Sequence, residues 1–236
     1  MANWITHMML ADSLMKMGLD ADARGFAVGN IAPDCNVENA DWTDFTPPRA
    51  VTHWMTGEHK DSADCEGFWD QYIRGRAFTS REERAFFLGY YAHLVADSEF
   101  QKFYQSPEMT AARFERIKNI PEYAARVAGM PETHDTIRKM FNRQEKMGDQ
   151  VAIEREYLRK RPDSLYNTVL RRVTEFPDYI DYLPKGAITR KIPVMLAADA
   201  AAQDSGGYVF IRPEEHAEYV RRTAEMIYER VMEKMS

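Results

Sequence analysis

The feature that most constrains this chain is the spacing of its apolar residues, which recur at three- and four-residue intervals almost throughout. Strict alternation of the kind that strands show is hard to find outside residues 206–211. The pattern therefore predicts an all-α fold, with glycine and proline residues separating the helices. Helices are expected over residues 4–17, 21–31, 61–74, 80–105, 107–118, 132–147, 149–160, 163–174 and 186–203, and from 213 onward.

The length of the chain favours one domain. Its 236 residues are enough to bury a core without disulfides, and no polar low-complexity block divides them. We therefore expect a single all-helical domain over residues 1–236, built as a multi-helix bundle. The longest irregular stretch, roughly 34–58, is too long for a simple connector in a compact domain, so it is expected to carry function.

Charge and cysteine content limit the partners and the compartment. The chain has 31 Lys+Arg and 37 Asp+Glu, and its basic pairs are scattered rather than gathered into a stripe, so long nucleic acid is not an expected partner. Only two cysteines are present, and the N-terminal segment has no basic region before its apolar residues. His7, Asp12 and Lys16 interrupt that apolar stretch. These features predict a cytoplasmic protein without a transmembrane segment.

Two helices can be oriented from the sequence. Ser80 followed by Glu83 forms a capping-box pattern that begins the helix over 80–105. The C-terminal helix begins at Pro213 and has His216 at the margin of its apolar face. The stripe expected to be buried on that face is Ala217, Val220, Ala224, Ile227 and Val231.

The helix over 80–105 carries the most informative pair, His93 and Asp97. Their four-residue spacing stacks an imidazole above a carboxylate on one helix face, close enough to share a cation. The same face holds Phe86, Tyr90 and Phe100, so the pair should be buried, and burying an unpaired carboxylate is expensive. Either a distant Arg or Lys reaches in to neutralise Asp97, or a divalent metal ion does.

Three further residues are candidates for the same site. His7 shares a helix face with Ala11 and Leu14 and should point inward, as a ligand or as a hydrogen-bonded core histidine. Asp34 follows a proline that ends the preceding helix, which leaves its carboxylate free to aim at a site or to cap a turn. His53 lies in the irregular stretch, where it is a ligand or an ordinary loop histidine.

In order along the chain, four segments resemble the zinc-dependent phospholipase C family, which also includes the fungal single-strand nucleases. They are residues 4–7 (WITH), 29–34 (GNIAPD), 52–54 (THW) and 87–97 (FLGYYAHLVAD). Together they reproduce the family's ordered His, Asp, His and His-x-x-x-Asp pattern within roughly the first 100 residues. The resemblance implies an all-helical enzyme that holds metal ions between its helices.

The resemblance also implies a role for each matching residue. Asp34, His53, His93 and Asp97 would ligate one metal ion, and Asp97 would bridge to a second ion held by His7. Zn²⁺ suits His and Asp ligands, with Mn²⁺ or Fe²⁺ as alternatives. The implied activity is hydrolysis of a small phosphoester or phospholipid by metal-activated water, as in a phosphodiesterase or a phospholipase C, with Asp34 as a ligand that doubles as general base.

The chain departs from the family pattern at two points. The processed family enzymes begin with a Trp whose amine and carbonyl bind metal. Trp4 here is preceded by three residues, so it cannot offer an amine. The family also uses a His-x-x-x-Glu motif for a third ion, and no histidine of this chain has a Glu four residues later. We therefore expect one or two ions rather than three.

Two rival functions and one question of specificity stay open. His134-Asp135 is the dipeptide of HD-type phosphohydrolases, although a helix cap and an acidic first turn after Pro131 explain it without a metal ion. An incomplete cluster is also compatible with a non-catalytic helical protein that holds a structural ion.

Substrate choice depends on whether the aromatic residues form a wall for a choline head group, a base or an apolar tail, or belong to the core. These residues are Trp42, Phe45, Trp54 and Trp69.

Overall fold

The computed structural model describes residues 3–41, 43–204 and 207–235. Over these ranges the chain forms twelve α-helices and three short 3-10 helices, and its strands are limited to a single two-stranded sheet. The prediction of an all-α fold is confirmed. None of the described helices combines the length and the apolar character that crossing a bilayer requires.

The elements follow one another along the chain in this order: α1 (Trp4–Lys16), α2 (Ala23–Gly29), η1 (Ala32–Asp34), β1 (Val37–Glu38), β2 (Phe45–Thr46), α3 (Arg49–Thr52), η2 (Lys60–Ser62), α4 (Cys65–Tyr72), α5 (Arg81–Gln105), α6 (Pro107–Lys118), α7 (Pro121–Val127), α8 (His134–Met140), α9 (Arg143–Lys160), α10 (Leu165–Thr168), η3 (Leu170–Arg172), α11 (Ala187–Ala201) and α12 (Pro213–Met235).

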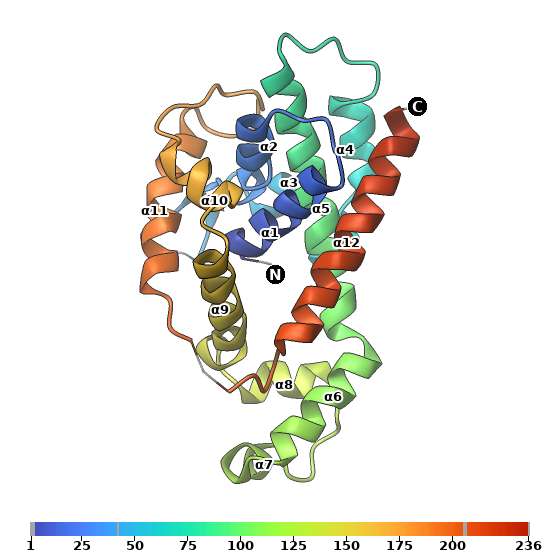
Figure 1. Cartoon of the computed structure of the whole chain (residues 1–236). Coiled ribbons are helices and arrows are strands. Elements are labelled where there is room, and N and C mark those ends of the chain that lie inside the picture. Colours follow the sequence, from blue (N-terminus) through green and yellow to red (C-terminus); the bar gives the residue numbers. More distant parts are fainter. Residues whose placement is uncertain (1–2, 42, 205–206, 236) are drawn as a thin grey trace.

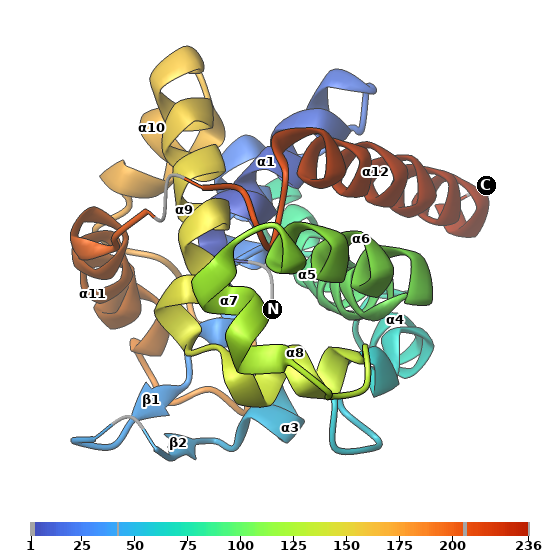
Figure 2. The same cartoon turned by 90° about the horizontal axis from the view of Figure 1, so that it is seen from below.

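Helix α1 lies at the centre of the molecule, with α9 and α11 on one side and α5 and α12 on the other (Figure 1). Its central position explains why residues on every side of α1 are buried. Helices α6, α7 and α8 close one end, and the antiparallel β1–β2 hairpin lies with α3 along one edge (Figure 2). One connected apolar core runs from Trp4 in α1 to Val231 in α12.

The closest contact between helices joins α2 to α5 and depends on three glycines. A Cβ atom built at Gly89 of α5 would lie 2.4 Å from the Phe26 carbonyl oxygen of α2. On α2, a Cβ at Gly25 or Gly29 would come within 2.2 Å or 2.1 Å of a carbonyl oxygen of α5. Since real Cβ contacts are never this short, only glycine allows the two backbones to approach in this way.

The predicted capping box at Ser80 forms only in part. The Ser80 hydroxyl accepts a hydrogen bond from the Glu83 amide at 3.0 Å, as expected. The Glu83 carboxylate, however, accepts from the Thr79 amide and hydroxyl and pairs with Arg76, all at 2.7 Å. The cap therefore fastens the segment before α5 as well as the helix terminus.

The predicted break between residues 147 and 149 is wrong. Helix α8 ends at Met140, Phe141 is extended, and Asn142 begins α9 with a complete capping box to Glu145. Helix α9 then runs through Gly148 without interruption. The cap residue, rather than the glycine, decides where the helix starts.

Several smaller expectations also need correction. The helix expected over 163–174 is divided into α10 and η3, and that expected over 61–74 begins only at Cys65. Helix α7 and the short helices within 34–58 were not predicted. Residues 207–211 form no strand, and residue 206 lies outside the described residues. On α12, Ala217 is exposed, whereas the other four stripe residues are buried together with His216 and Tyr219.

Replacing Gly89 by alanine tests the contact between α2 and α5. Helix propensity alone would make the variant about 1 kcal/mol more stable. Because the new methyl group overlaps the Phe26 carbonyl oxygen, we expect Gly89→Ala instead to lower the free energy of unfolding by about 2 kcal/mol or more. Urea unfolding followed by circular dichroism measures the change, and an unchanged or higher midpoint would contradict the close contact.

Candidate metal centre

The five residues singled out as possible ligands come together at one buried place. His7 projects from the first turns of α1, Asp34 ends η1, His53 caps the C-terminal end of α3, and His93 and Asp97 lie on α5. Their side chains form two groups whose donor atoms all lie within 4.8 Å of one another, one of His7, His93 and Asp97 and the other of Asp34, His53 and His93. His93 belongs to both.

Backbone carbonyls fix the orientation of two of the imidazoles. His93 Nδ1 lies 2.7 Å from the Asn30 carbonyl oxygen, and His53 Nδ1 lies 3.1 Å from that of Arg49. A carbonyl oxygen only accepts, so each Nδ1 carries the proton and each Nε2 keeps a lone pair. Both Nε2 atoms face the cluster. Histidines that ligate metals are typically held by such a second hydrogen bond.

The distances between donor atoms suit a tetrahedral ion. His53 Nε2 is 3.2 Å from Asp34 Oδ1 and 3.3 Å from His93 Nε2. Asp97 Oδ2 is 3.3 Å from His93 Nε2 and 3.6 Å from His53 Nε2. Zinc bonds of about 2.0–2.1 Å in a tetrahedron separate neighbouring ligand atoms by about 3.3 Å. These four separations therefore lie close to the value for neighbouring zinc ligands, and His and Asp are side chains that zinc accepts.

A lysine reaches into this donor set. Lys60, the first residue of η2, contacts Asp97 Oδ2 with its Nζ atom, which also lies 2.8 Å from His53 Nε2 and 3.8 Å from Asp34 Oδ1. The sequence left open whether a distant Arg or Lys or a divalent metal ion neutralises the buried Asp97. In the described structure the cationic side chain of Lys60 is its partner. The ammonium thus lies beside three of the four side chains that would surround an ion.

The loop that carries Lys60 is anchored at its base and at its tip. The Asp64 amide donates to the Trp54 carbonyl oxygen at 2.8 Å, next to an isolated bridge between Met55 and Ala63. At the tip, the Lys60 amide donates to Gln101 Oε1 of α5 at 3.1 Å. Residues 54–64 thus form a short closed loop over the cluster.

His7 has a different environment from the other two histidines. It is fully buried, and neither of its ring nitrogens has a hydrogen-bond partner among the described residues. Its ring stacks on that of His93 with centroids 3.9 Å apart, and its Nε2 lies 3.7 Å from Asp97 Oδ1. Buried polar atoms without partners are rare in proteins, so His7 Nε2 is a donor atom available to a ligand.

Electrostatics keep the two acids charged and two of the three histidines neutral. Burial lowers the pKa of both His7 and His53 to about 4. Burial alone would raise the pKa of Asp97 and of Asp34, but the Lys60 ammonium and the neighbouring imidazoles hold both well below their usual range. Neutral imidazoles and ionised carboxylates are the forms that bind metal.

The turn that carries His53 is held by a chain of aromatic side chains. Trp54 has φ of 52°, a left-handed conformation that bulky residues seldom adopt. Its indole donates to the Tyr182 hydroxyl at 3.2 Å, which donates to the Tyr90 hydroxyl at 2.8 Å. Tyr90 then donates to the Thr52 carbonyl oxygen at 2.6 Å. This chain ties the end of α3 to α5 and so aligns His53 with His93.

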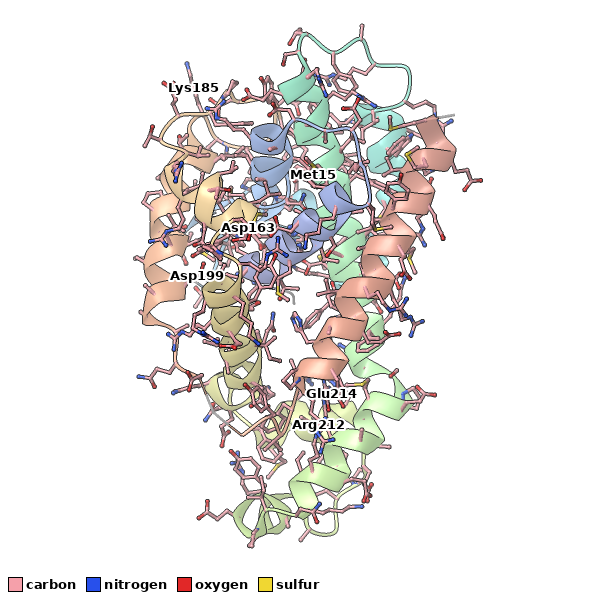
Figure 3. The ribbon with its side chains drawn as sticks, viewed as in Figure 1. Met15, Asp163, Lys185, Asp199, Arg212 and Glu214 are labelled. Carbon is pink, nitrogen blue, oxygen red and sulfur yellow. The ribbon has the colours of Figure 1, made fainter. Side chains whose placement is uncertain are left out.

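Asp34 connects the cluster to a cavity. Its side chain is 15% exposed, whereas those of the other four candidate residues are at most 1% exposed. The cavity it lines has a volume of about 350 Å³ and is bounded by Trp4, Phe45 and α11. Asp199, which is labelled in Figure 3, marks the α11 wall. A small molecule entering the site would meet Asp34 first.

Within the described residues, no cluster of potential metal ligands surrounds His134-Asp135, the dipeptide of the HD-type hypothesis. His134 and Asp135 begin α8 behind the Thr133 cap, and Asp135 pairs on the surface with Arg138 and Lys139. Neither residue joins three or more potential metal ligands in the part of the chain that the structure describes. The arrangement matches the alternative explanation of a capped helix start.

The aromatic residues do not form a common wall. Trp69 is buried in the core against Tyr91, whereas Trp54 is half-buried and packs edge-on against Phe68 and Tyr72 at the margin of the core. Phe45 lines the cavity beside Asp34. Trp42 lies outside the described residues.

A second buried polar network, not predicted from the sequence, lies beside the cluster between α1, α9 and α12. Glu154 accepts hydrogen bonds from Thr6 at 2.5 Å, Gln150 at 2.9 Å and Asn3 at 3.0 Å. The Thr6 hydroxyl also lies 2.9 Å from His216 Nε2. The four-residue spacing of Gln150 and Glu154 was the available signal. No cation is among these partners, and burial raises the pKa of Glu154 to about 7.

Replacing Glu154 by glutamine tests this network through its pH dependence. An acid whose pKa rises from 4.5 to about 7 on folding stabilises the fold below pH 4.5, and this contribution is lost as the pH rises through 7. Relative to Glu154→Gln, the wild type should therefore lose up to about 3 kcal/mol between pH 4.5 and 8. Urea midpoints at several pH values measure the difference. Glu122→Gln, on the exposed side of α7, is the control, and parallel profiles for all three proteins would contradict the raised pKa.

Comparison of the chain with known proteins adds no family to this picture. No family model matches the chain, and neither a curated protein nor a solved structure gives a significant match. The case for a function therefore depends on the geometry of the cluster and its cavity.

Proposed function

We propose that this protein is a metal-dependent phosphoester hydrolase, with a small phosphoester or a phospholipid head group as its substrate. The observation that carries the proposal is the convergence of five nitrogen and oxygen donors from four separate parts of the chain. Two of these histidines have their Nε2 lone pairs fixed toward the centre, and the third is buried without any hydrogen-bond partner among the described residues. Such a donor set suits Zn²⁺, and also Mn²⁺ or Fe²⁺.

In this proposal Asp34, His53, His93 and Asp97 hold one ion, and His7 with the second oxygen of Asp97 holds another. Ions bound there would activate water and stabilise negative charge on phosphoryl oxygens. The protein supplies the orientation of the donors, through Asn30 and the aromatic chain behind His53, and a cavity that reaches the cluster at Asp34. We assign to Asp34, the accessible acid, the role of accepting a proton from the water that would attack phosphorus.

The proposal includes a cytoplasmic location. Both cysteines are free, and Cys35 is buried. Unpaired thiols are typical of proteins in a reducing compartment.

Metal content tests the proposal directly. We expect protein dialysed against Zn²⁺ to hold about two ions per chain by elemental analysis. His7→Ala should lose one ion, because only one donor group contains His7, whereas His93→Ala should lose both, because both groups contain His93. Asp97→Asn should also lose both, because it removes the carboxylate proposed to bridge the two ions. Glu99→Gln removes a carboxylate of the same helix that pairs with Lys102 instead, and should leave the metal content unchanged. Wild-type protein without bound zinc would overturn the proposal.

A second candidate is a helical protein that binds no ion here, and the position of Lys60 favours it. In that case Lys60 replaces the metal as the permanent partner of Asp97. Lys60→Met separates the two. If Lys60 only occupies the site until an ion binds, the variant should bind zinc more tightly than the wild type. If Lys60 is the permanent partner, the wild type should hold no zinc and Lys60→Met should be destabilised by about 3 kcal/mol.

A further inference from the structure

We infer that the cavity beside Asp34 selects substrates that carry a second anionic group, such as a phosphate, besides the phosphoryl group that reacts. This inference rests on the proposed function, because it assigns the substrate class of the same site. It is carried by the charges that line the cavity and by the position of Arg49, which already covers the ring of Phe45 there.

Two guanidinium groups line the cavity without a carboxylate partner. Arg49 begins α3 and Arg143 begins α9, so they approach from two separate segments. Both are exposed, and neither forms an ion pair within the described residues, in which most other exposed arginines do. Arginine forks bind phosphate and carboxylate groups through paired hydrogen bonds.

The position of Arg143 has no benefit for its own helix. The first turn of a helix favours acidic residues, because the helix dipole places partial positive charge there. Glu145 follows that rule in the same turn and completes the cap with Asn142. A cation at the first position of α9 opposes the dipole, and no acidic side chain of the described residues pairs with it, unlike Arg81 at the first position of α5, which pairs with Asp20.

The aromatic face at the cavity is not open to a cationic head group. The Arg49 guanidinium lies 4.0 Å from the ring centroid of Phe45, and Lys191 Nζ lies 5.6 Å from it. A quaternary ammonium such as choline would have to displace Arg49 from the ring and remain beside cations. Phe45 therefore positions Arg49 instead of binding the substrate.

Neither of the two carboxylates that line the cavity, Asp34 and Asp199, forms an ion pair with Arg49 or Arg143. Lys191 is neutralised by Glu38, which also pairs with Arg190. Asp34 faces His53 and Lys60 on the cluster side. On the α11 wall, Asp199 accepts a hydrogen bond from the Tyr166 hydroxyl at 3.0 Å. The two arginines are thus the groups left to bind an anion away from the cluster. A neighbouring cavity of about 390 Å³, which shares Arg143, gives the rest of such a substrate room.

Three diesters with the same leaving group test the inference: the p-nitrophenyl esters of ethyl phosphate, of phosphocholine and of 2-phosphoethyl phosphate. In each, a water oxygen bonds to phosphorus, the bond from phosphorus to the aryl oxygen breaks, and p-nitrophenolate leaves. We expect kcat/KM with the zinc-loaded protein to be at least about tenfold higher for the 2-phosphoethyl ester than for the others. The double variant Arg49→Gln/Arg143→Gln should lower it about thirtyfold for that ester and less than about threefold for the ethyl ester.

Binding of ethane-1,2-diyl bisphosphate, measured by calorimetry against ethyl phosphate, separates the inference from the proposed function. Arg159→Gln is the control, since Arg159 lies on α9 outside the cavity and pairs with Glu156. The inference is wrong if the diesters are hydrolysed but the double variant affects all three equally, or if the phosphocholine ester is the best substrate. Either result would still support the proposed hydrolase activity. If none is hydrolysed, the hydrolase is wrong. In that case, binding of the bisphosphate that the double variant abolishes would still support an anion site. The absence of bisphosphate binding would overturn the anion site.

Discussion

The close approach of α2 to α5 is the constraint on which the site depends. Gly25, Gly29 and Gly89 let the two helices approach until a carbonyl of one lies where a side chain of the other would begin. At this separation the Asn30 carbonyl oxygen, just beyond α2, can accept a hydrogen bond from His93 of α5. The chain then turns through η1 and delivers Asp34 to the same place. Helices at the usual separation of 8–10 Å would not bring this carbonyl so close to the imidazole.

Charge balance organises the next layer. Two ionised carboxylates, Asp34 and Asp97, lie beside three histidines, two of which burial keeps neutral. Such an arrangement attracts a cation strongly, because unpaired buried carboxylates are costly. The loop over residues 54–64 supplies one in the form of Lys60. The cluster is therefore built for positive charge, and the two candidate functions differ only in whether that charge is an ammonium or an ion from solution.

The sequence predicted the helical class and the residues that gather at the cluster, because helical periodicity shows which face of a helix turns inward. His7, His93 and Asp97 were found as polar residues on apolar faces. Asp34 and His53 lie in or beside the irregular stretch, and only the family resemblance joined them to the others. Lys60 could not be identified, since nothing in a loop sequence shows where its long side chain ends.

The break before α9 was misplaced because the cap at Asn142 outweighs the low helix propensity of Gly148. The network around Glu154 joins residues 148 and 210 positions apart, and only its contact between Gln150 and Glu154 is local in the sequence.

The position of Lys60 also separates folding from cofactor loading. In many small zinc domains the ligands repel one another or remain unsatisfied until the ion arrives, so the apo chain is unfolded. Here the chain itself provides a counter-charge for its buried acids, and the core around α1 and α5 is complete without a ligand. In the proposed hydrolase, the polypeptide would thus assemble first and acquire its ion later. The supply of metal in the cell would then set how much of the protein is active and not how much of it is folded.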